Sequence, residues 1–577
     1  MIADKNAKSL SFARHGLTVA LSLALGTTAF AAAAPDTNAT SAWAATATRA
    51  VDISVASLSG QVADDESLPI VVSLKLRNQN LMDDYMAEQQ RPGSVAYHQW
   101  MTSEESTHYF APTAEQAQAV ADYLEGMGYT NIEIAPNRLL VTADGTAGMA
   151  RRAFDTDFAR VTREGEDSVA NVRDARVPAF LGEQVEAVYG LQTLNRMHTY
   201  SRTDPTPASV GGKGRNAVDA VASSQYLPHQ FQTVYHAGST PNGRNTAVAI
   251  VGWGSMTTSV SDLARYEADY AIAAVPTSIV KVGGSSTDNS GEPEWALDAQ
   301  AIVGISGGVK SLTFYAAKTA TDANLLSTIN RAVSDNTAKI VNMSWGGCES
   351  STSFADAQFK IGVTQGQTFS ASSGDSGAYT CGTSGGNGTW GSIRGISDPT
   401  SSPFVISVGG TTLTTDASAN YVGEVTWPYS GGGVSKYEPK PSWQSTLAGS
   451  FRQVPDVAFD ADWDNSPMAY YLGRSGSRQA GYYLNGGTSL ASPLFVGAWA
   501  RLESAHANGM GFAPKALYAY ASSFPFHDVT VGKNGPTATY YSAKVGYDNT
   551  TGWGSFDIQA ANTFITNTPG FITTSNQ

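Results

Sequence analysis

The chain has 577 residues, which is enough for two or three domains with full-sized hydrophobic cores. Hydrophobic residues make up 42% of it, charged residues only 15%, and glycine occurs 57 times, a composition typical of a compact, loop-rich globular protein. The 50 acidic residues outnumber the 36 basic ones and give a formal charge of -14, which argues against nucleic acid or an anionic membrane as a partner.

The N-terminus has the residue order of a secretory signal peptide. Basic residues precede the apolar run LTVALSLALG, and the small residues AFA follow at 29–31. An uncleaved membrane anchor is the alternative, but threonines and alanines follow the run, and no other stretch of about 20 apolar residues could span a bilayer. We therefore predict a signal peptide over residues 1–31 and a soluble secreted protein, with the periplasm as a compartment of transit.

Residues 68–162 are predicted to form a small independent domain. LPIVVSLKL predicts a strand and NLMDDYMAEQQ a helix, and a second helix through TAEQAQAVADYLEGMG begins with Thr113 and Gln116 at capping-box spacing. NIEIAPNRLLVTA predicts two strands around a turn, followed by a helix through TAGMARRAFD and a strand near FARVT. This order fits a split βαβ sandwich, and nothing in it is typical of a catalytic site.

The next segment has the composition of a linker. RMHTYSRTDPTPASVGGKGRN, residues 196–216, is rich in glycine, proline, serine and threonine and has almost no large apolar residues. We expect an exposed linker that contains a processing site, because proteases cut such segments.

From about residue 217, short apolar strands alternate with helical segments. The strands are TAVAIVGW, SLTFYAA, KIVNMSWG, TFSASSGD and PFVISVGG, and segments such as TDANLLSTINRAVSDN lie between them. Apolar strands separated by helices predict a parallel sheet with both faces covered, and active groups collect at the carboxyl ends of such strands.

The segment GEPEWALDAQAIVGIS, residues 291–306, predicts a helix with two carboxyl groups on one face. Glu294 and Asp298 are four residues apart, which places them about 40° apart around a helix, whereas Glu292 points away. Such a pair is often only solvated, but the residues beside Asp298 are apolar, so the pair is expected where the helix enters a core. Carboxyl groups that are close together there share a proton, and one pKa rises.

Asp375 is a third candidate acid, in SASSGDSGAYTCG, residues 370–382, at the end of an apolar strand. An Asx turn or a helix cap is the alternative interpretation of an aspartate in such a glycine- and serine-rich stretch. The chain's two cysteines, Cys348 and Cys381, each follow an apolar strand and are too few for a disulfide scaffold or a zinc site. A single bridge and two unpaired thiols both remain open.

GGTSLASP, residues 486–493, places Ser489 between small residues at the start of a helix, a setting in which hydrolases expose a nucleophile. A serine hydroxyl needs a base to accept its proton, and in most serine hydrolases that base is histidine. None of the eight histidines lies in the HGTxVAG-type helix start of a subtilisin-like enzyme, which argues against a histidine-dependent relative. The helix with the carboxyl pair of Glu294 and Asp298 stands in that place instead.

EWALD, SSGDSG and GGTSLASP, in this order and at these separations, resemble bacterial members of the sedolisin (serine-carboxyl peptidase) family. The similarity continues through NMSWG, SPFVISVGGTTL, SGGGVSKYEPKPSWQ and RQVPDVAFDAD, and it covers nearly all of 220–570. The earlier part of the chain resembles a pro-kumamolisin-like propeptide. The resemblance implies an α/β fold with a subtilisin-like parallel sheet in a peptidase domain over 217–577, and an N-terminal α+β, ferredoxin-like propeptide domain over 50–195.

The resemblance also assigns catalytic roles. Ser489 would attack the scissile carbonyl, Glu294 would accept its proton, and Asp298 would orient and tune Glu294. Asp375 would stand at the oxyanion hole, protonated so that it donates a hydrogen bond to the developing negative oxygen. A glutamate base explains why no histidine is needed.

One structural calcium ion is implied near the C-terminus, in FHDVTVGKNG and AKVGYDNTTGWGS. The ligands carried over are the side chains of Asp528 and Asp548 and the main-chain carbonyls of Val529, Lys544 and Gly546, a hard-oxygen set that calcium prefers. The family often has glycine where Lys544 stands, which makes this ligand the exception. Two turn aspartates without a metal are the alternative interpretation.

Together these inferences predict an acid-acting serine endopeptidase, secreted as a zymogen, that hydrolyses polypeptides as a monomer. Its propeptide would be an intramolecular inhibitor and folding aid. A tripeptidyl-peptidase-type exopeptidase is the closest alternative, because the same catalytic set serves both activities. An inactive binding module on the same fold is the alternative from another class, and the presence of all four catalytic groups argues against it.

Overall fold

The structure is a computed structural model that describes residues 43–54, 56–163, 165–208, 225–351, 354–382, 388–568 and 570–571. The predicted signal peptide at 1–31 lies outside these residues. No helix in the described part of the chain is both long and apolar enough to cross a membrane.

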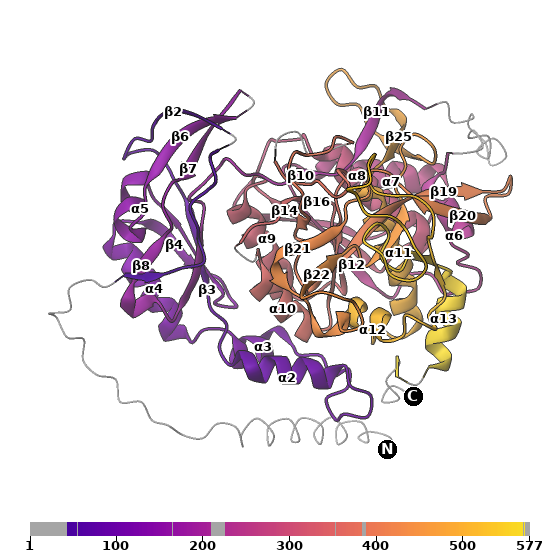
Figure 1. Ribbon diagram of the computed structural model, residues 1–577, viewed down its shortest axis with the longest axis horizontal. Coiled ribbons are helices and arrows are strands. Elements are labelled where there is room, and N and C mark those ends of the chain that lie inside the picture. The colour runs from indigo at the N-terminus through magenta and orange to yellow at the C-terminus, as the bar shows by residue number, and fades with distance from the viewer. Residues whose placement is uncertain are drawn as a thin grey trace, which may run out of the picture.

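The N-terminal domain has a four-stranded antiparallel sheet in the order β4-β5-β3-β9, with two helices in the connections (Figure 1). In chain order its elements are β3 (Ile70–Leu74), α4 (Ala114–Gly126), β4 (Thr130–Ile134), β5 (Leu140–Asp144), α5 (Ala147–Phe154) and β9 (Val185–Tyr189). This βαββαβ order is the predicted ferredoxin-like arrangement. Its fourth strand is β9 and not the strand predicted near FARVT, so the domain extends beyond the predicted 68–162. The capping box predicted for α4 is present: the Thr113 hydroxyl accepts from the Gln116 N–H, and the Gln116 side chain accepts from the Thr113 N–H.

A second, three-stranded sheet in this domain was not predicted. It has the order β2-β6-β7, and its strands are β2 (Ser57–Gln61), β6 (Phe158–Arg163) and β7 (Glu166–Asn171). Only β6 had a clear sequence signal, since all of β2 is exposed and polar residues begin β7.

The C-terminal domain is built on an eight-stranded sheet. The path is β13-β14-β12-β15-β17-β19-β20, with β23 also paired to β19, and every pairing except β19 with β20 is parallel. The strands are β12 (Ala247–Trp253), β13 (Thr277–Val282), β14 (Ser311–Ala317), β15 (Ile340–Met343), β17 (Thr368–Ser372), β19 (Val405–Thr415), β20 (Tyr421–Thr426) and β23 (Val457–Asp460). The predicted parallel sheet is therefore confirmed.

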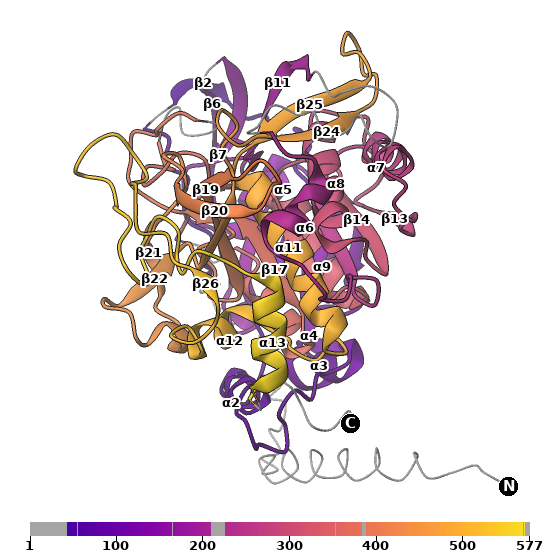
Figure 2. The same ribbon diagram turned by 90° about the vertical axis from the view of Figure 1, so that its right-hand side faces the viewer.

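Helices cover both faces of this sheet. On one face α8 (Glu292–Ser306) packs against α11 (Thr488–Ala505), and on the other lie α9 (Asp322–Asp335) and α10 (Asp356–Thr364) (Figures 1 and 2). Helix α8 begins with a proline near its N-terminus and ends at Gly307, whose φ of 68° is the left-handed conformation of a helix C-cap. Because α8 is almost fully buried, its carboxyl groups are taken out of water by the fold itself.

The N-terminal domain packs against the α9 and α10 side of the larger domain through α2 (Gln79–Gln89) and α3 (Ser103–Phe110). Part of this contact is apolar, because Tyr85 and Phe110 belong to the same hydrophobic cluster as the core of the larger domain. Neutral hydrogen bonds add to it: the Gln89 amide donates to the Thr364 carbonyl at 2.8 Å, and Asn137 donates to Asn330 at 2.8 Å. One ion pair joins Lys360 to Asp83 at 2.5 Å. The N-terminal domain is therefore bound to the face of the larger domain that carries α9 and α10.

The connecting segment, residues 196–208, is buried or half-buried over 197–201, contrary to the prediction from its composition, and mostly exposed over 202–207, as predicted. It forms β10 (His198–Thr199), which pairs antiparallel with β16 (Trp345–Cys348), and β11 (Arg202–Pro207), which pairs antiparallel with β25 (Gly481–Gly486) (Figure 1). Tyr200, between the two strands, is completely buried. A polar segment is expected to be exposed unless its main chain pairs with another strand. Here β16 and β25 of the larger domain supply those main-chain hydrogen bonds. The rest of the predicted linker, 209–216, lies outside the described residues.

Cys348 and Cys381 form a disulfide bridge with their Cα atoms 4.9 Å apart. Cys348 ends β16, which follows β15, and Cys381 follows β17, the strand next to β15 in the sheet. The bridged interpretation is therefore confirmed, and its reason is that neighbouring parallel strands deliver both residues to one edge.

Removing this bridge should cost about 3 to 4 kcal/mol of unfolding free energy in the chain-entropy model, because it closes a loop of 33 residues. We expect the double variant Cys348→Ser, Cys381→Ser to show this loss in equilibrium denaturation. Wild type in the presence of a reductant is the control and should behave like the variant. An unchanged denaturation midpoint in both would contradict the expectation.

Candidate active site

Ser489 lies in the first turn of α11, two residues after Gly487, whose conformation other residues rarely adopt. Gly487 has φ of 109°, and a Cβ there would clash with both the Tyr200 carbonyl oxygen and Asp375 Oδ2. Glycine at this position therefore lets three groups converge. The positive end of the helix dipole lies at the same point, where it favours negative charge.

Glu294 and Asp298 stand one turn apart on α8, as predicted, and both are fully buried. Burial raises the pKa of Glu294 to about 8, although the hydroxyls of Ser201 and Ser489 beside it lower the value. Neither hydroxyl reaches ordinary hydrogen-bond geometry with Glu294, so both its oxygens are left without a partner. The carboxyl group of Glu294 is therefore free to accept a proton from the Ser489 hydroxyl after a small movement.

Asp298 is held from its far side. The Ser344 hydroxyl donates to Asp298 Oδ1 at 2.6 Å, and Oδ2 has no partner. Burial raises the pKa of Asp298 well above its usual range, and the charge of Glu294 raises it further. Two buried carboxyl groups that repel each other in this way hold one proton between them over a wide pH range. Glu292, by contrast, faces Thr258, whose hydroxyl donates to it at 2.6 Å.

Asp375 follows β17 and is also completely buried. Its Oδ1 accepts from the main-chain N–H of Thr488 at 2.8 Å and from the Thr488 hydroxyl at 2.7 Å, while Oδ2 has no partner. Burial raises its pKa well above the usual range, although the bonds from Thr488 lower it. The fixed oxygen orients the carboxyl group, and the free oxygen faces the space that the Tyr200 carbonyl enters.

The connecting segment runs directly over Ser489. The Tyr200 main-chain N–H donates to Ser489 Oγ at 3.1 Å, and the Ser489 N–H donates to the Tyr200 carbonyl oxygen at 3.2 Å. The Tyr200 side chain is fully buried, and its hydroxyl lies 2.6 Å from Ser397 Oγ. The peptide bond from Tyr200 to Ser201 is thus the bond presented to the serine.

Three groups of this site were not singled out from the sequence. Ser344, which also accepts from Ser489 Oγ through its carbonyl at 3.2 Å, lies in the NMSWG match, and Thr488 directly precedes Ser489. Their motif positions could have indicated them. Tyr200 carried no such signal, because its role depends on a contact across 289 residues of chain.

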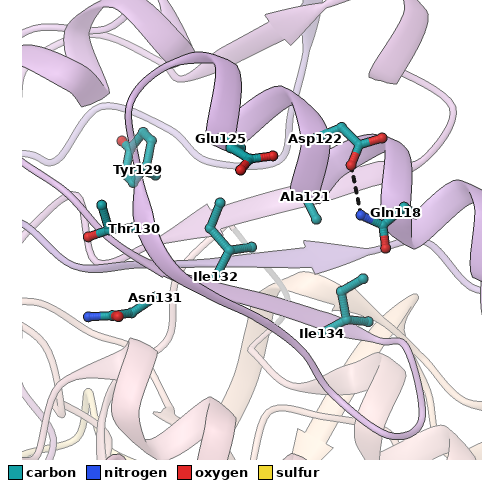
Figure 3. A pocket seen from close by; sticks show the side chains of 9 residues that line it. All are labelled: Gln118, Ala121, Asp122, Glu125, Tyr129, Thr130, Asn131, Ile132 and Ile134. Carbon is teal, nitrogen blue, oxygen red and sulfur yellow. Dashed lines mark hydrogen bonds between the residues drawn. The ribbon is translucent and has the colours of Figure 1, made fainter.

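One hollow of the surface lies away from these groups. A depression of about 530 Å³ between α4 and β4 of the N-terminal domain is lined by residues such as Tyr129, Ile132 and Ile134 (Figure 3). None of its lining residues is a predicted site residue. The groove at Ser489 is filled by the chain itself.

The residues predicted to bind calcium lie together on two loops. Asp528 Oδ2 accepts from the Gly546 N–H at 2.8 Å, and Asp548 Oδ2 accepts from the Lys544 N–H at 3.1 Å. Both carboxyl groups therefore converge on the loop 544–546, and Val529 is buried next to Asp528. Gly546 has φ of 74°, whereas Lys544 has no left-handed φ, so lysine is tolerated at its position. In the described residues no group of three or more His, Cys, Asp or Glu side chains is suited to a metal.

Two family models match the chain. Pro-kumamolisin, activation domain, matches residues 55–194, and the subtilase family matches residues 280–554. These matches fit the division into a smaller N-terminal domain and a larger domain with a parallel sheet.

Individual relatives match over most of the chain. Sedolisin of Pseudomonas sp. (strain 101) is 38% identical over 580 residues, covering 95% of this chain and 96% of its own length. Xanthomonalisin of Xanthomonas sp. (strain T-22) is 40% identical over 553 residues, covering 87% of this chain and 66% of its own length.

A solved structure agrees with the fold. Pseudomonas sedolisin, a serine-carboxyl proteinase complexed with two molecules of pseudo-iodotyrostatin, superposes with a TM-score of 0.56 and 38% identity, covering 60% of this chain and all of its own. The larger domain therefore has a subtilisin-like fold. The chain belongs to the sedolisin (serine-carboxyl peptidase) family and is a serine-type peptidase made as a zymogen with an N-terminal propeptide domain.

Proposed function

We propose that this zymogen is a secreted, acid-acting endopeptidase whose first substrate is its own Tyr200–Ser201 bond. The path of the connecting segment carries the proposal: β10 and β11 pair with strands of the peptidase domain on the two sides of Ser489. An extended polypeptide substrate would gain the same main-chain hydrogen bonds as an added strand. Polypeptides are therefore the substrate class that the groove fits.

In the proposed reaction, Ser489 Oγ attacks the carbonyl carbon of the residue that occupies the position of Tyr200, and Glu294 accepts the hydroxyl proton. Asp298 orients Glu294 and shares its proton. The negative charge on the carbonyl oxygen is stabilised by the Ser489 N–H and by a hydrogen bond from protonated Asp375. Glu294 then gives its proton to the leaving amine, and water hydrolyses the acyl-enzyme by the same sequence.

The electrostatics of the site favour work in acid. Asp375 must keep its proton to donate, and burial favours the protonated form. Glu294 must give up its proton to act as a base, and its pKa of about 8 belongs to the groove covered by the connecting segment. Once that segment leaves, water returns to the groove and lowers the pKa of Glu294. While the segment is in place, Glu294 and Asp298 share one proton, so one of their carboxyl groups stays ionised and can serve as the base for self-cleavage. Until that cut, the segment fills the groove at Ser489 and excludes other substrates.

An endopeptidase is favoured over a tripeptidyl-peptidase because the bound chain continues on both sides of Ser489. The residues before Tyr200 extend through β10 without a free amino terminus three residues upstream. A tripeptidyl-peptidase would need such a terminus in the groove. The same four catalytic groups serve both activities, so the difference has to be measured on substrates.

The test uses the sequence MHTYSRTDP, residues 197–205, with an acetylated amino terminus. The mature enzyme should cut it between tyrosine and serine at pH 3 to 5, as identified by mass spectrometry of the products. The unblocked peptide HTYSRTDP, which offers a tripeptide before the same bond, is the control. Cleavage of the unblocked peptide alone would show an exopeptidase, and cleavage of neither would contradict the proposed activity.

We further propose one structural calcium ion at the loops of Asp528 and Asp548, with the carbonyls of Val529, Lys544 and Gly546 as additional ligands. The support is the convergence of both carboxylates on the loop 544–546. When bound, the calcium ion would link two C-terminal loops through their oxygen ligands, and it would take no part in the reaction.

Replacing Asp548 by alanine should remove this stabilisation and leave the catalytic groups of the folded enzyme in place. At calcium about 100 times above its Kd, the ion contributes about 2.7 kcal/mol. A chelator should therefore lower the Tm of wild type and not that of Asp548→Ala. Asp416→Ala, which removes an exposed turn aspartate elsewhere, should keep the chelator sensitivity of wild type. Equal chelator effects in wild type and Asp548→Ala would point to a metal at another place.

The proposal also covers the boundaries of the signal peptide, the propeptide and the mature enzyme, and its oligomeric state. We propose that residues 1–31 are removed during export, that the propeptide covers 50–195, and that the mature enzyme is a monomer that begins within 196–216. Cleavage at Tyr200–Ser201 places the first mature terminus at Ser201, and later trimming within the glycine-rich part of the linker would move that terminus further along 196–216. Size-exclusion chromatography and N-terminal sequencing of the secreted protein test both.

A further inference from the structure

Arg202, which follows Ser201, places its side chain on the ring of Trp463, and none of the catalytic groups takes part in this contact. The Arg202 guanidinium carbon is 5.6 Å from the centroid of the Trp463 ring. Among the residues that the structure describes, Arg202 forms no side-chain hydrogen bond and no ion pair. Within this part of the chain its guanidinium group therefore interacts with the Trp463 ring alone. A guanidinium over the face of tryptophan is attracted by the negative charge of the ring face.

The backbone fixes this contact by register. Arg202 pairs with Gly486 of β25. A Cβ on Gly486 would lie 2.6 Å from the main-chain nitrogen of Trp463, so β25 is in direct contact with the segment that carries Trp463. The side chains of β11 alternate as in any strand. Thr203 points inward, where its hydroxyl is 3.0 Å from that of Tyr470, and Arg202 points the other way, toward Trp463. Any substrate with the same register would place its second residue after the cut on Trp463.

The ring of Trp463 is held rigid before a substrate arrives. Trp427 meets it edge to face with centroids 4.5 Å apart, and Tyr429 stacks on it at 5.7 Å. Only 7% of the Trp463 surface is exposed. A side chain that is packed in this way loses little conformational entropy when a cation is placed on it.

We infer that Trp463 is a specificity-determining residue that selects arginine or lysine at the second position after the cleaved bond. This inference rests on the proposed endopeptidase function, because it takes the connecting segment as a stand-in for a substrate. An aromatic face suits an enzyme that works in acid. A carboxylate that recognised the cation would lose its charge as the pH falls, whereas neither an indole ring nor arginine titrates there.

The experiment compares two acetylated peptides, MHTYSRTDP and the same sequence with citrulline in place of arginine. Citrulline keeps the shape of arginine and removes its charge. In wild type, kcat/KM should be about two to five times higher for the arginine peptide, the range expected for a solvent-exposed cation on an aromatic face. The ratio should stay constant between pH 3 and pH 5.

Variants of the ring separate its role from general packing. Trp463→Leu should bring the ratio to one, and Trp463→Phe, which keeps a weaker aromatic face, should give an intermediate ratio. Trp390→Leu is the matched control, because Trp390 stacks on Tyr429 at 4.9 Å without contacting Arg202, and it should keep the wild-type ratio. The wild-type ratio tests the inference even where the leucine variant fails to fold.

The outcomes are distinct. Cleavage of both peptides between tyrosine and serine with a ratio of one in wild type would overturn the role of Trp463 and leave the proposed function standing. A preference for arginine that disappears toward pH 3 would assign recognition to a carboxylate and overturn it as well. Cleavage of neither peptide would overturn the proposed function and this inference together.

Discussion

Ser489→Ala is expected to accumulate as a precursor that keeps its propeptide, whereas wild type is cut between Tyr200 and Ser201. The variant loses the oxygen that accepts from the Tyr200 N–H and attacks its carbonyl. Removing the nucleophile of a serine peptidase costs about a millionfold in kcat, so self-cleavage should not be detectable. Intact mass and N-terminal sequencing after a shift to acid pH measure both the cut and its position.

Ser504→Ala is the matched control for this variant. Ser504 lies near the other end of α11, and its hydroxyl accepts from the Asn245 N–H at 3.2 Å. The change removes the same atom from the same helix and should leave processing intact. Normal processing of Ser489→Ala in a host that lacks proteases would contradict self-cleavage. Processing of that variant only after active wild type is added would show that the cut can also be made between molecules.

Asp375 is expected to set the alkaline limit of activity. As the pH rises Asp375 ionises and can no longer donate to the carbonyl oxygen, so kcat/KM should fall. As the pH falls, the pair of Glu294 and Asp298 becomes fully protonated and kcat/KM should fall again. The result is a bell-shaped profile in the acid range.

Two substitutions separate donation from titration. Asp375→Asn keeps a hydrogen-bond donor that does not titrate, so it should retain part of the activity and lose most of the alkaline limb. Asp375→Ala should lose about 100- to 1000-fold in kcat at every pH, as for other oxyanion-hole donors. Asp460→Asn, which alters another fully buried carboxyl group, should keep the wild-type profile. A wild-type optimum at or above neutrality would contradict the glutamate base.

The parts of this site that could be predicted from sequence are those that depend on short-range geometry. Helical spacing alone placed Glu294 and Asp298 on one face, and neighbouring strands of a parallel sheet explained why Cys348 and Cys381 meet. Motifs known from the family then brought Asp375 and Ser489 together.

The position of Tyr200 could not be predicted in this way. Its contact with Ser489 joins positions 289 residues apart, and the composition of 196–216 indicated exposure. Main-chain pairing with β16 and β25 overrides that composition, since the hydrogen bonds are indifferent to the side chains. The three-stranded sheet of the propeptide domain escaped prediction for the same reason, because partners at long range stabilise polar strands.

Helices α10 and α11, which cover opposite faces of the large sheet, each carry an acid that ties the stability of the fold to pH. Burial raises the pKa of Glu503 to about 7 and that of Asp356 to about 7, from usual values near 4. A carboxyl group whose pKa is higher in the folded than in the unfolded chain favours folding below the unfolded value and loses that contribution as the pH rises through the folded one. Between about pH 4 and pH 7, each step toward neutrality therefore weakens the fold at these groups. The acid in which the peptidase is proposed to work is the medium in which these groups hold its native structure best.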